Sequence, residues 1–272
     1  MATAARARAR GVSSLIDVEC HPIHDPEYIA KCRDQMHQNS GLLHLRSFLK
    51  SEGIATLQRE AEEASHQAFS SEESHNTYLD QDDPSFSPTH PRNQQQRSSK
   101  RLVAFDQLRF DSKLRELYRC PLFKTFVQGV LGLPTMFESA DPMNAVHLNY
   151  FGIQDRLGWH FDNSEFFVNL LLKKASGGGE FEFAHDTRTD DDPNYAIVQQ
   201  VLSESSDLTH TVTPSSGSLL VFRGRYSMHR VKPVTDGERI TAILTYEQQP
   251  GVMMNDYTRR KFFGRGLSEA RV

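Results

Sequence analysis

The stretch Trp159-His160-Phe161-Asp162-Asn163 precedes an apolar run at residues 166–172. Successive side chains of a β-strand point to opposite faces, so this stretch predicts His160 and Asp162 on one face and Phe161 on the other. An imidazole and a carboxylate on one face form two legs of a facial metal site. His229 follows a second apolar stretch, residues 219–222, and supplies a third leg. The sequence therefore predicts one metal site built from three residues.

A fourth residue adds a co-substrate to this prediction. Arg239 lies ten positions after His229 and opens the strand-like stretch 239–246. We expect this strand to pair beside the strand at 219–222, with Arg239 and Thr241 on its inward face. A buried guanidinium needs an anionic partner. The distal carboxylate of 2-oxoglutarate can accept its bidentate fork, and two His with one carboxylate and open positions suit non-haem Fe(II).

The series His160, Asp162, His229 and Arg239 resembles the pattern of the Fe(II)/2-oxoglutarate-dependent dioxygenase superfamily, over about a hundred residues. The resemblance implies a mainly β fold with flanking helices, in which a double-stranded β-helix (jelly-roll) core follows an N-terminal helical extension. It implies that the first three residues bind Fe(II), that Arg239 and Thr241 contact 2-oxoglutarate, and that dioxygen is a co-substrate with ascorbate as reductant. By similarity to prolyl-hydroxylase-like members, Tyr150 is also expected to contact 2-oxoglutarate.

The reaction implied by this resemblance is hydroxylation of an unactivated C–H bond, with conversion of 2-oxoglutarate to succinate and CO2. Residues 160–183 also resemble the free-amino-acid radical halogenases, in which Gly replaces the carboxylate ligand. Because this chain keeps Asp162, we expect hydroxylation or another oxidation such as desaturation, and not halogenation. The expected substrate is a small polar molecule, a free amino acid being the leading candidate. Its expected contacts are Asn163, Glu165, Arg225 and Arg97.

Two alternatives stay open at this point. One is a prolyl-type hydroxylase that acts on a protein or peptide. The other is a non-catalytic jelly-roll binding module, against which the intact series of four site residues counts. A cupin-type sugar-binding jelly roll would give no reason for Arg239.

Composition limits the partners. The net charge of -4 over 272 residues argues against nucleic-acid binding driven by bulk charge, and no apolar run approaches the length of a membrane span. Three widely spaced cysteines, Cys20, Cys32 and Cys120, fit reduced thiols, so a cytoplasmic protein is expected. An Arg-rich start could instead direct the chain to an organelle. Oligomeric state is not indicated by the sequence.

The rest of the chain is expected to form one domain around the jelly roll. Residues 1–12 are expected to be a disordered tail and 13–272 the oxygenase domain, with helical support and a lid at 13–143, the core at 144–250 and a tail at 251–272. Helix-forming residues without Gly or Pro predict a helix near 27–37. Apolar residues at helical spacing predict helices near 51–64 and 110–131, the last divided at Pro121. The polar segment 70–100 is expected to be either an ordered lid, with Tyr78, His90 and Arg97 facing the substrate, or a disordered loop.

Overall fold

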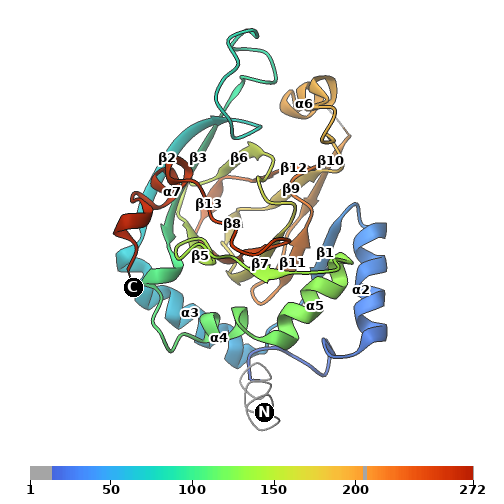
Figure 1. Cartoon of the computed structure of the whole chain (residues 1–272), viewed down its shortest axis with the longest axis vertical. Helices are drawn as coiled ribbons and strands as arrows, with labels where there is room; N and C mark the ends of the chain where they lie inside the picture. Colours follow the sequence, from blue (N-terminus) through green and yellow to red (C-terminus); the bar gives the residue numbers. More distant parts are fainter. Residues whose placement is uncertain (1–13, 205–206, 272) are drawn as a thin grey trace.

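Two antiparallel β-sheets face each other and enclose a common interior (Figure 1). The structure is a computed structural model that describes residues 14–204 and 207–271. The expected tail at 1–12 lies outside the described residues. In the larger sheet the strand order is β1 (Leu42–Leu45), β11 (Leu219–Phe222), β7 (Phe167–Lys173), β14 (Arg239–Leu244), β5 (Val146–Phe151), β3 (Gln95–Val103) and β2 (Phe69–Asn76). The smaller sheet has the order β10 (Thr209–Val212), β9 (Phe181–Ala184), β12 (Met228–Val231) and β6 (Leu157–His160).

Short strand pairs lie outside these two sheets, namely β13 (Val234–Asp236) with β8 (Gly177–Gly178) and β15 (Tyr246–Glu247) with β4 (Phe137–Glu138). The glycines of β8 allow this tight pairing. Gly178 has φ +70°, and a Cβ there would lie 2.1 Å from the backbone oxygen of Pro233. A side chain at this position would therefore push the two strands apart.

Helices cover the outer faces of the sheets. Their bounds are α2 (Pro26–Gln38), α3 (Ser51–Ala64), α4 (Lys113–Tyr118), α5 (Pro121–Leu131), α6 (Tyr195–Leu202) and α7 (Asp256–Phe263), with 3-10 turns at Ser65–Gln67, Phe105–Gln107 and Leu267–Glu269. Figure 1 shows α3, α4 and α5 below the larger sheet and α6 beside the smaller one. Pro121 occupies the first turn of α5, where its missing N–H costs nothing, and so separates α5 from α4 as expected. Among the described residues, no helix is long and apolar enough to cross a membrane.

The described residues form five buried clusters, and three of them fill the layers of this architecture. The largest lies between the helices and the outer face of the larger sheet and includes Leu57, Phe123 and Tyr150. A second joins the inner faces of the two sheets through Leu42, Phe181, Phe183, Leu220 and Phe222. A third packs Trp159 and Phe161 against α6. The expected fold class, mainly β with flanking helices around a jelly roll, is confirmed.

The structure corrects three expectations about the strands and the tail. β14 does not pair with β11, because β7 lies between them; β14 pairs with β7 and β5. The segment 70–100 is neither a lid nor a disordered loop over its whole length, since β2 and β3 pair as an antiparallel extension of the larger sheet. The segment from 251 onward contains α7, which packs on β2 and β3.

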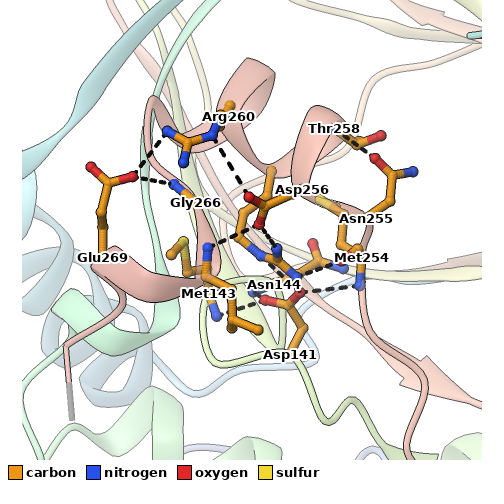
Figure 2. A network of polar contacts seen from close by, with 12 residues as sticks. Asp141, Met143, Asn144, Met254, Asn255, Asp256, Thr258, Arg260, Gly266 and Glu269 are labelled. Carbon is orange, nitrogen blue, oxygen red and sulfur yellow. Dashed lines mark hydrogen bonds and ion pairs between the residues drawn. The ribbon is translucent and has the colours of Figure 1, made fainter.

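A buried ion pair holds α7 in place. The guanidinium of Arg259 donates two hydrogen bonds to Asp141 Oδ2, at 2.7 Å from Nη2 and 3.2 Å from Nε, and their side chains are 2% and 0% exposed. Asp141 also accepts from the backbone N–H groups of Met143, Asn144 and Met254, as Figure 2 shows. This carboxylate therefore joins the chain before β5 to the chain before α7.

Breaking this pair is expected to destabilise the fold strongly. Arg259→Met should lower the free energy of unfolding by about 3–5 kcal/mol, because it leaves the Asp141 carboxylate buried and without its charge partner. Urea denaturation measures the difference. The matched control is Arg260→Met on the same helix, where the side chain is 54% exposed, and it should cost under about 1 kcal/mol. Equal losses in the two variants would show that the buried pair has no special role.

Candidate metal and co-substrate site

Three side chains meet inside the barrel near the end of β6. Among the described residues, His160, Asp162 and His229 form the group that could hold a metal ion, with ligand atoms all within 4.8 Å of one another. Asp162 Oδ1 lies 3.5 Å from His160 Nε2, and Asp162 Oδ2 lies 3.5 Å from His229 Nε2. His160 and His229 are directly opposite each other in the pairing of β6 with β12. Cross-strand pairing therefore brings together residues far apart in sequence.

Backbone carbonyls orient both imidazoles toward the same point. His160 Nδ1 donates to Gly158 O at 2.8 Å, and His229 Nδ1 donates to Ser227 O at 3.0 Å. A carbonyl oxygen only accepts, so each Nδ1 carries the proton and each Nε2 presents a lone pair. This is the second-layer hydrogen bonding that metal-binding histidines use.

The charge state of the site also suits a cation. Burial alone would raise the pKa of Asp162, but the imidazoles of His229 and His160 hold it well below its usual range. Burial, followed by the nearby His229, lowers the pKa of His160. Asp162 Oδ2 has no hydrogen-bond partner. An anionic carboxylate with an orphaned oxygen beside the Nε2 atoms of two imidazoles fits a divalent metal of the Fe(II) class.

Gly224, in the connection from β11 to β12, lies against this carboxylate. Its carbonyl accepts a hydrogen bond of 3.0 Å from the backbone N–H of Asp162. A Cβ at this position would lie 1.9 Å from Asp162 Oδ2 and 3.0 Å from His229 Cε1. Two of the three candidate ligands therefore keep their positions only if residue 224 has no side chain.

Gly224→Ala is expected to weaken Fe(II) binding by at least about 10-fold, because the methyl group displaces a candidate ligand oxygen. Anaerobic Fe(II) titration measures the change. Gly152→Ala is the matched control, since its Cβ would meet Asp155 Oδ2 at an ordinary 3.6 Å. An iron affinity like that of the unchanged protein in the Gly224 variant would contradict the packing argument.

Arg239 is a buried cation whose charge has no protein partner. Its residue is 3% exposed, and its Nε and Nη1 groups donate no hydrogen bond among the described residues. Its guanidinium carbon lies 5.4 Å from the ring of Phe151, and burial lowers its pKa to about 10. Thr241 shares its face of β14, where its hydroxyl bonds to Asn169 Oδ1 and Leu170 O. An anionic ligand would satisfy the unpaired guanidinium.

Tyr150 does not face this interior, so its expected contact with 2-oxoglutarate is wrong. Its hydroxyl donates a 2.6 Å hydrogen bond to Ala61 O of α3, and its ring belongs to the buried cluster between helices and sheet. The neighbouring Asn149 points inward, opposite Thr241 in the register of β5 with β14. Asn149 Oδ1 is buried and unpaired, which makes Asn149 a polar lining residue where Tyr150 was expected.

Three of the four expected substrate contacts line a pocket of about 300 Å³, which none of the three triad residues lines. They are Asn163, Glu165 and Arg225; the remaining lining residues are Ser164, Phe166, Tyr226, Tyr246, Glu247, Gln248, Gln249 and Val252. Arg225 donates to Asn163 O at 3.1 Å and pairs with Asp190 at 3.3 Å. The acidic insert after β9 therefore contributes Asp190 to the rim.

Arg97 does not line this pocket, and its contact with substrate stays a prediction. It pairs with Glu72 on β2 at 2.7 Å, and its side chain is 58% exposed. Tyr78 and His90 lie in the loop between β2 and β3. Tyr78 donates to Pro193 O at 2.8 Å, and His90 stacks on Phe86. These two residues are used in packing the loop against α6 and the insert before it.

The family of the chain follows from a match over most of its length. A family model described as Halogenase D matches residues 24–260. The chain belongs to the Halogenase D family. A search of curated proteins gives no match.

Solved structures share the fold at low sequence identity. An oxygenase of the 2OG-Fe(II) family from Burkholderia pseudomallei has a TM-score of 0.53 at 15% identity, covering 82% of this chain and 92% of that one. The carbocyclase SnoK from nogalamycin biosynthesis gives 0.58 at 13%, covering 87% and 92%. A prolyl-4-hydroxylase from Pseudomonas putida gives 0.51 at 15%, covering 79% and 96%. These neighbours share the fold of this member of the Halogenase D family, in which His160, Asp162 and His229 form a His-Asp-His group.

The sequence analysis did not identify several polar residues that lie in the interior of this member of the Halogenase D family. Lys100, Asn149 and Asn169 are buried inside the barrel, each on a strand of the larger sheet. Asn169 interrupts the apolar run of β7. This could have indicated a polar residue in the interior, because a polar residue in a buried strand must find a partner. Gly224 gave no such signal, since many loop glycines have no close neighbour.

Proposed function

We propose that this protein is an Fe(II)- and 2-oxoglutarate-dependent hydroxylase of a small polar substrate, a free amino acid being the leading candidate. The single observation that carries the proposal is the pair of complementary sites in one interior. A facial triad with an orphaned carboxylate oxygen lies beside a buried guanidinium that lacks an anion. A binding module without catalysis would require neither.

Each residue has a separate role in this proposal. His160, Asp162 and His229 hold Fe(II) on one face, and the carbonyls of Gly158 and Ser227 keep both imidazoles in the metal-binding tautomer. Arg239 binds the far carboxylate of 2-oxoglutarate, and Thr241 lies beside it on β14. When bound, iron and 2-oxoglutarate supply the oxidation of a C–H bond by dioxygen, with release of succinate and CO2. Phe167, Phe181 and Phe222 surround His229 and exclude water from this side of the metal.

Asp162 is the basis for proposing hydroxylation rather than halogenation. In the free-amino-acid halogenases that residues 160–183 resemble, Gly stands in this place and leaves a metal position for chloride. Here the carboxylate oxygens lie 3.5 Å from each imidazole and occupy that position. The family model is described as a halogenase, and the retained Asp162 is the local difference that supports another outcome.

The pocket lined by Asn163, Glu165 and Arg225 supports a small substrate. Its volume of about 300 Å³ is at the low end for ligand sites. Asn163 and Glu165 supply an amide and a carboxylate that suit an amino group, while the Arg225 guanidinium is paired with Asp190. A peptide hydroxylase of the prolyl type is the second candidate, favoured by the shared fold of the P. putida prolyl-4-hydroxylase.

Succinate release against a panel of free amino acids and short peptides tests the proposal. Stimulation by a free amino acid, with mass-spectrometric gain of one oxygen in that acid, is the expected result. Turnover with peptides alone would instead establish the second candidate. Failure of every compound to raise succinate release above the background would contradict both.

A further inference from the structure

Lys100 on β3 is a second buried cation inside the barrel. The residue is 8% exposed, and its charged neighbours are Asp162 and Arg239, neither of which hydrogen-bonds to it. Among the described residues no carboxylate forms an ion pair with its ammonium. Burial lowers the pKa of Lys100 to about 8, although Asp162 opposes that change. A desolvated ammonium without an anion is costly unless a ligand supplies one.

The sheet register places Lys100 level with Arg239. Arg101 is opposite Tyr150 in the pairing of β3 with β5, so Lys100 comes opposite Phe151. Phe151 is itself opposite Arg239 in the pairing of β5 with β14. Lys100, Phe151 and Arg239 therefore form one row across three neighbouring strands on the inner face. The Lys100 ammonium also interacts electrostatically with His147, further along β5.

Helix α7 shields this ammonium from solvent. Lys100 Nζ lies 5.4 Å from the ring centroid of Phe262, while Phe263 meets His147 at 5.9 Å and packs with Leu102 and Met143. The buried pair of Arg259 with Asp141 fixes the helix in this position (Figure 2). Inside such a low-dielectric enclosure a charge attracts its counterion more strongly than it would in water.

The charges of the site indicate what that counterion is. Lys100, Arg239 and Asp162 together carry one net positive charge. Bound Fe(II) would add two positive charges, and bound 2-oxoglutarate, a dianion, would add two negative charges. One positive charge is left without a partner. Because Arg239 suits the far carboxylate of 2-oxoglutarate, the unmatched charge lies at Lys100.

We propose that Lys100 is a specificity-determining residue that binds a carboxylate of the substrate, so that the enzyme selects small carboxylic acids over their neutral analogues. This assignment rests on the proposed function. The other source of a carboxylate is 2-oxoglutarate itself, and the experiment separates the two.

The test uses Lys100→Met, which keeps the length of the stem and removes the charge. The probes are free L-amino acids and their α-carboxamides, scored by stimulated succinate release. The Kd of 2-oxoglutarate is measured in parallel from its visible band with Fe(II) without oxygen. Lys174→Met, an exposed lysine, is the matched control.

In the unchanged protein we expect at least one acid to be preferred over its amide by about 30-fold or more. Lys100→Met should reduce that preference to within about threefold and leave the Kd of 2-oxoglutarate within about threefold, while Lys100→Arg should keep much of the preference. Because the lost charge was unpaired, the ligand-free variant should melt no lower than the unchanged protein.

Three results would overturn the assignment. If Lys100→Met weakens the binding of 2-oxoglutarate by more than about 10-fold and keeps the preference for the acid over its amide, Lys100 binds the co-substrate. If the visible band forms but no acid is preferred over its amide, the proposal that Lys100 binds a substrate carboxylate is wrong, although the proposed function stands. Absence of the band in the unchanged protein would remove the proposed function together with this assignment.

Discussion

Arg239→Leu is expected to weaken 2-oxoglutarate binding by at least about 100-fold, and to change Fe(II) affinity by less than about threefold. The guanidinium is buried and lacks protein partners for Nε and Nη1, so the ligand carboxylate is its main source of stabilising contacts. The triad is built from other strands and does not depend on it. Anaerobic titrations with Fe(II) and then 2-oxoglutarate measure the two affinities separately.

The same variant gives a second readout in the absence of ligand. Removing an unpaired buried charge should leave the melting temperature of the ligand-free protein unchanged or raised, while the stabilisation by added 2-oxoglutarate is lost. Arg101→Leu is the matched control on a neighbouring strand, where the guanidinium pairs with Glu238 at 3.1 Å and is 42% exposed. If both arginine variants lose the same affinity for 2-oxoglutarate, Arg239 is not its anchor.

Asp162→Ala is expected to reduce hydroxylation by more than about 100-fold, beyond the 10–100-fold typical of losing a hydrogen-bond partner of a metal ligand. The carboxylate is the one anionic member of the triad, and both its oxygens lie within 3.5 Å of an imidazole nitrogen. The measurement is the amount of hydroxylated product formed per succinate released. Asp186→Asn, which replaces an exposed carboxylate, is the control. Turnover like that of the unchanged protein in Asp162→Ala would remove this residue from the metal site.

Chloride adds a test of the reaction outcome. With Asp162 in place, excess chloride should leave the product hydroxylated, because the carboxylate occupies the metal position that chloride would need. A chlorinated product from the unchanged protein would contradict the role given to Asp162 and would agree with the description of the family model.

The sequence predicted the triad and Arg239 because each lies on a short strand whose alternation is visible locally. Two-residue spacing places His160 and Asp162 on one face, and the register of β6 with β12 then brings His229 opposite His160. The helices α2, α3, α4 and α5 were predicted for the same reason, since their helix-forming residues or apolar spacing are local.

Other features depend on pairing between distant segments, which a single sequence does not encode in a readable way. Val146, Leu148 and Tyr150 alternate with His147 and Asn149, and either face of β5 could have been inward. In the structure α3 packs on the face of β5 that carries Tyr150, whose hydroxyl donates a hydrogen bond to Ala61 O. The face with His147 and Asn149 is therefore inward. β2 was missed because its sequence is polar, and it is stabilised by pairing with β3 and by contact with α7.

The most direct test of the central claim is anaerobic addition of Fe(II) and 2-oxoglutarate while the visible absorption is recorded. If His160, Asp162 and His229 hold one iron and Arg239 receives the keto acid, a charge-transfer band should appear and saturate at one Fe(II) and one 2-oxoglutarate per chain. No band at saturating concentrations of both, or an undiminished band in Asp162→Ala and Arg239→Leu, would contradict the account.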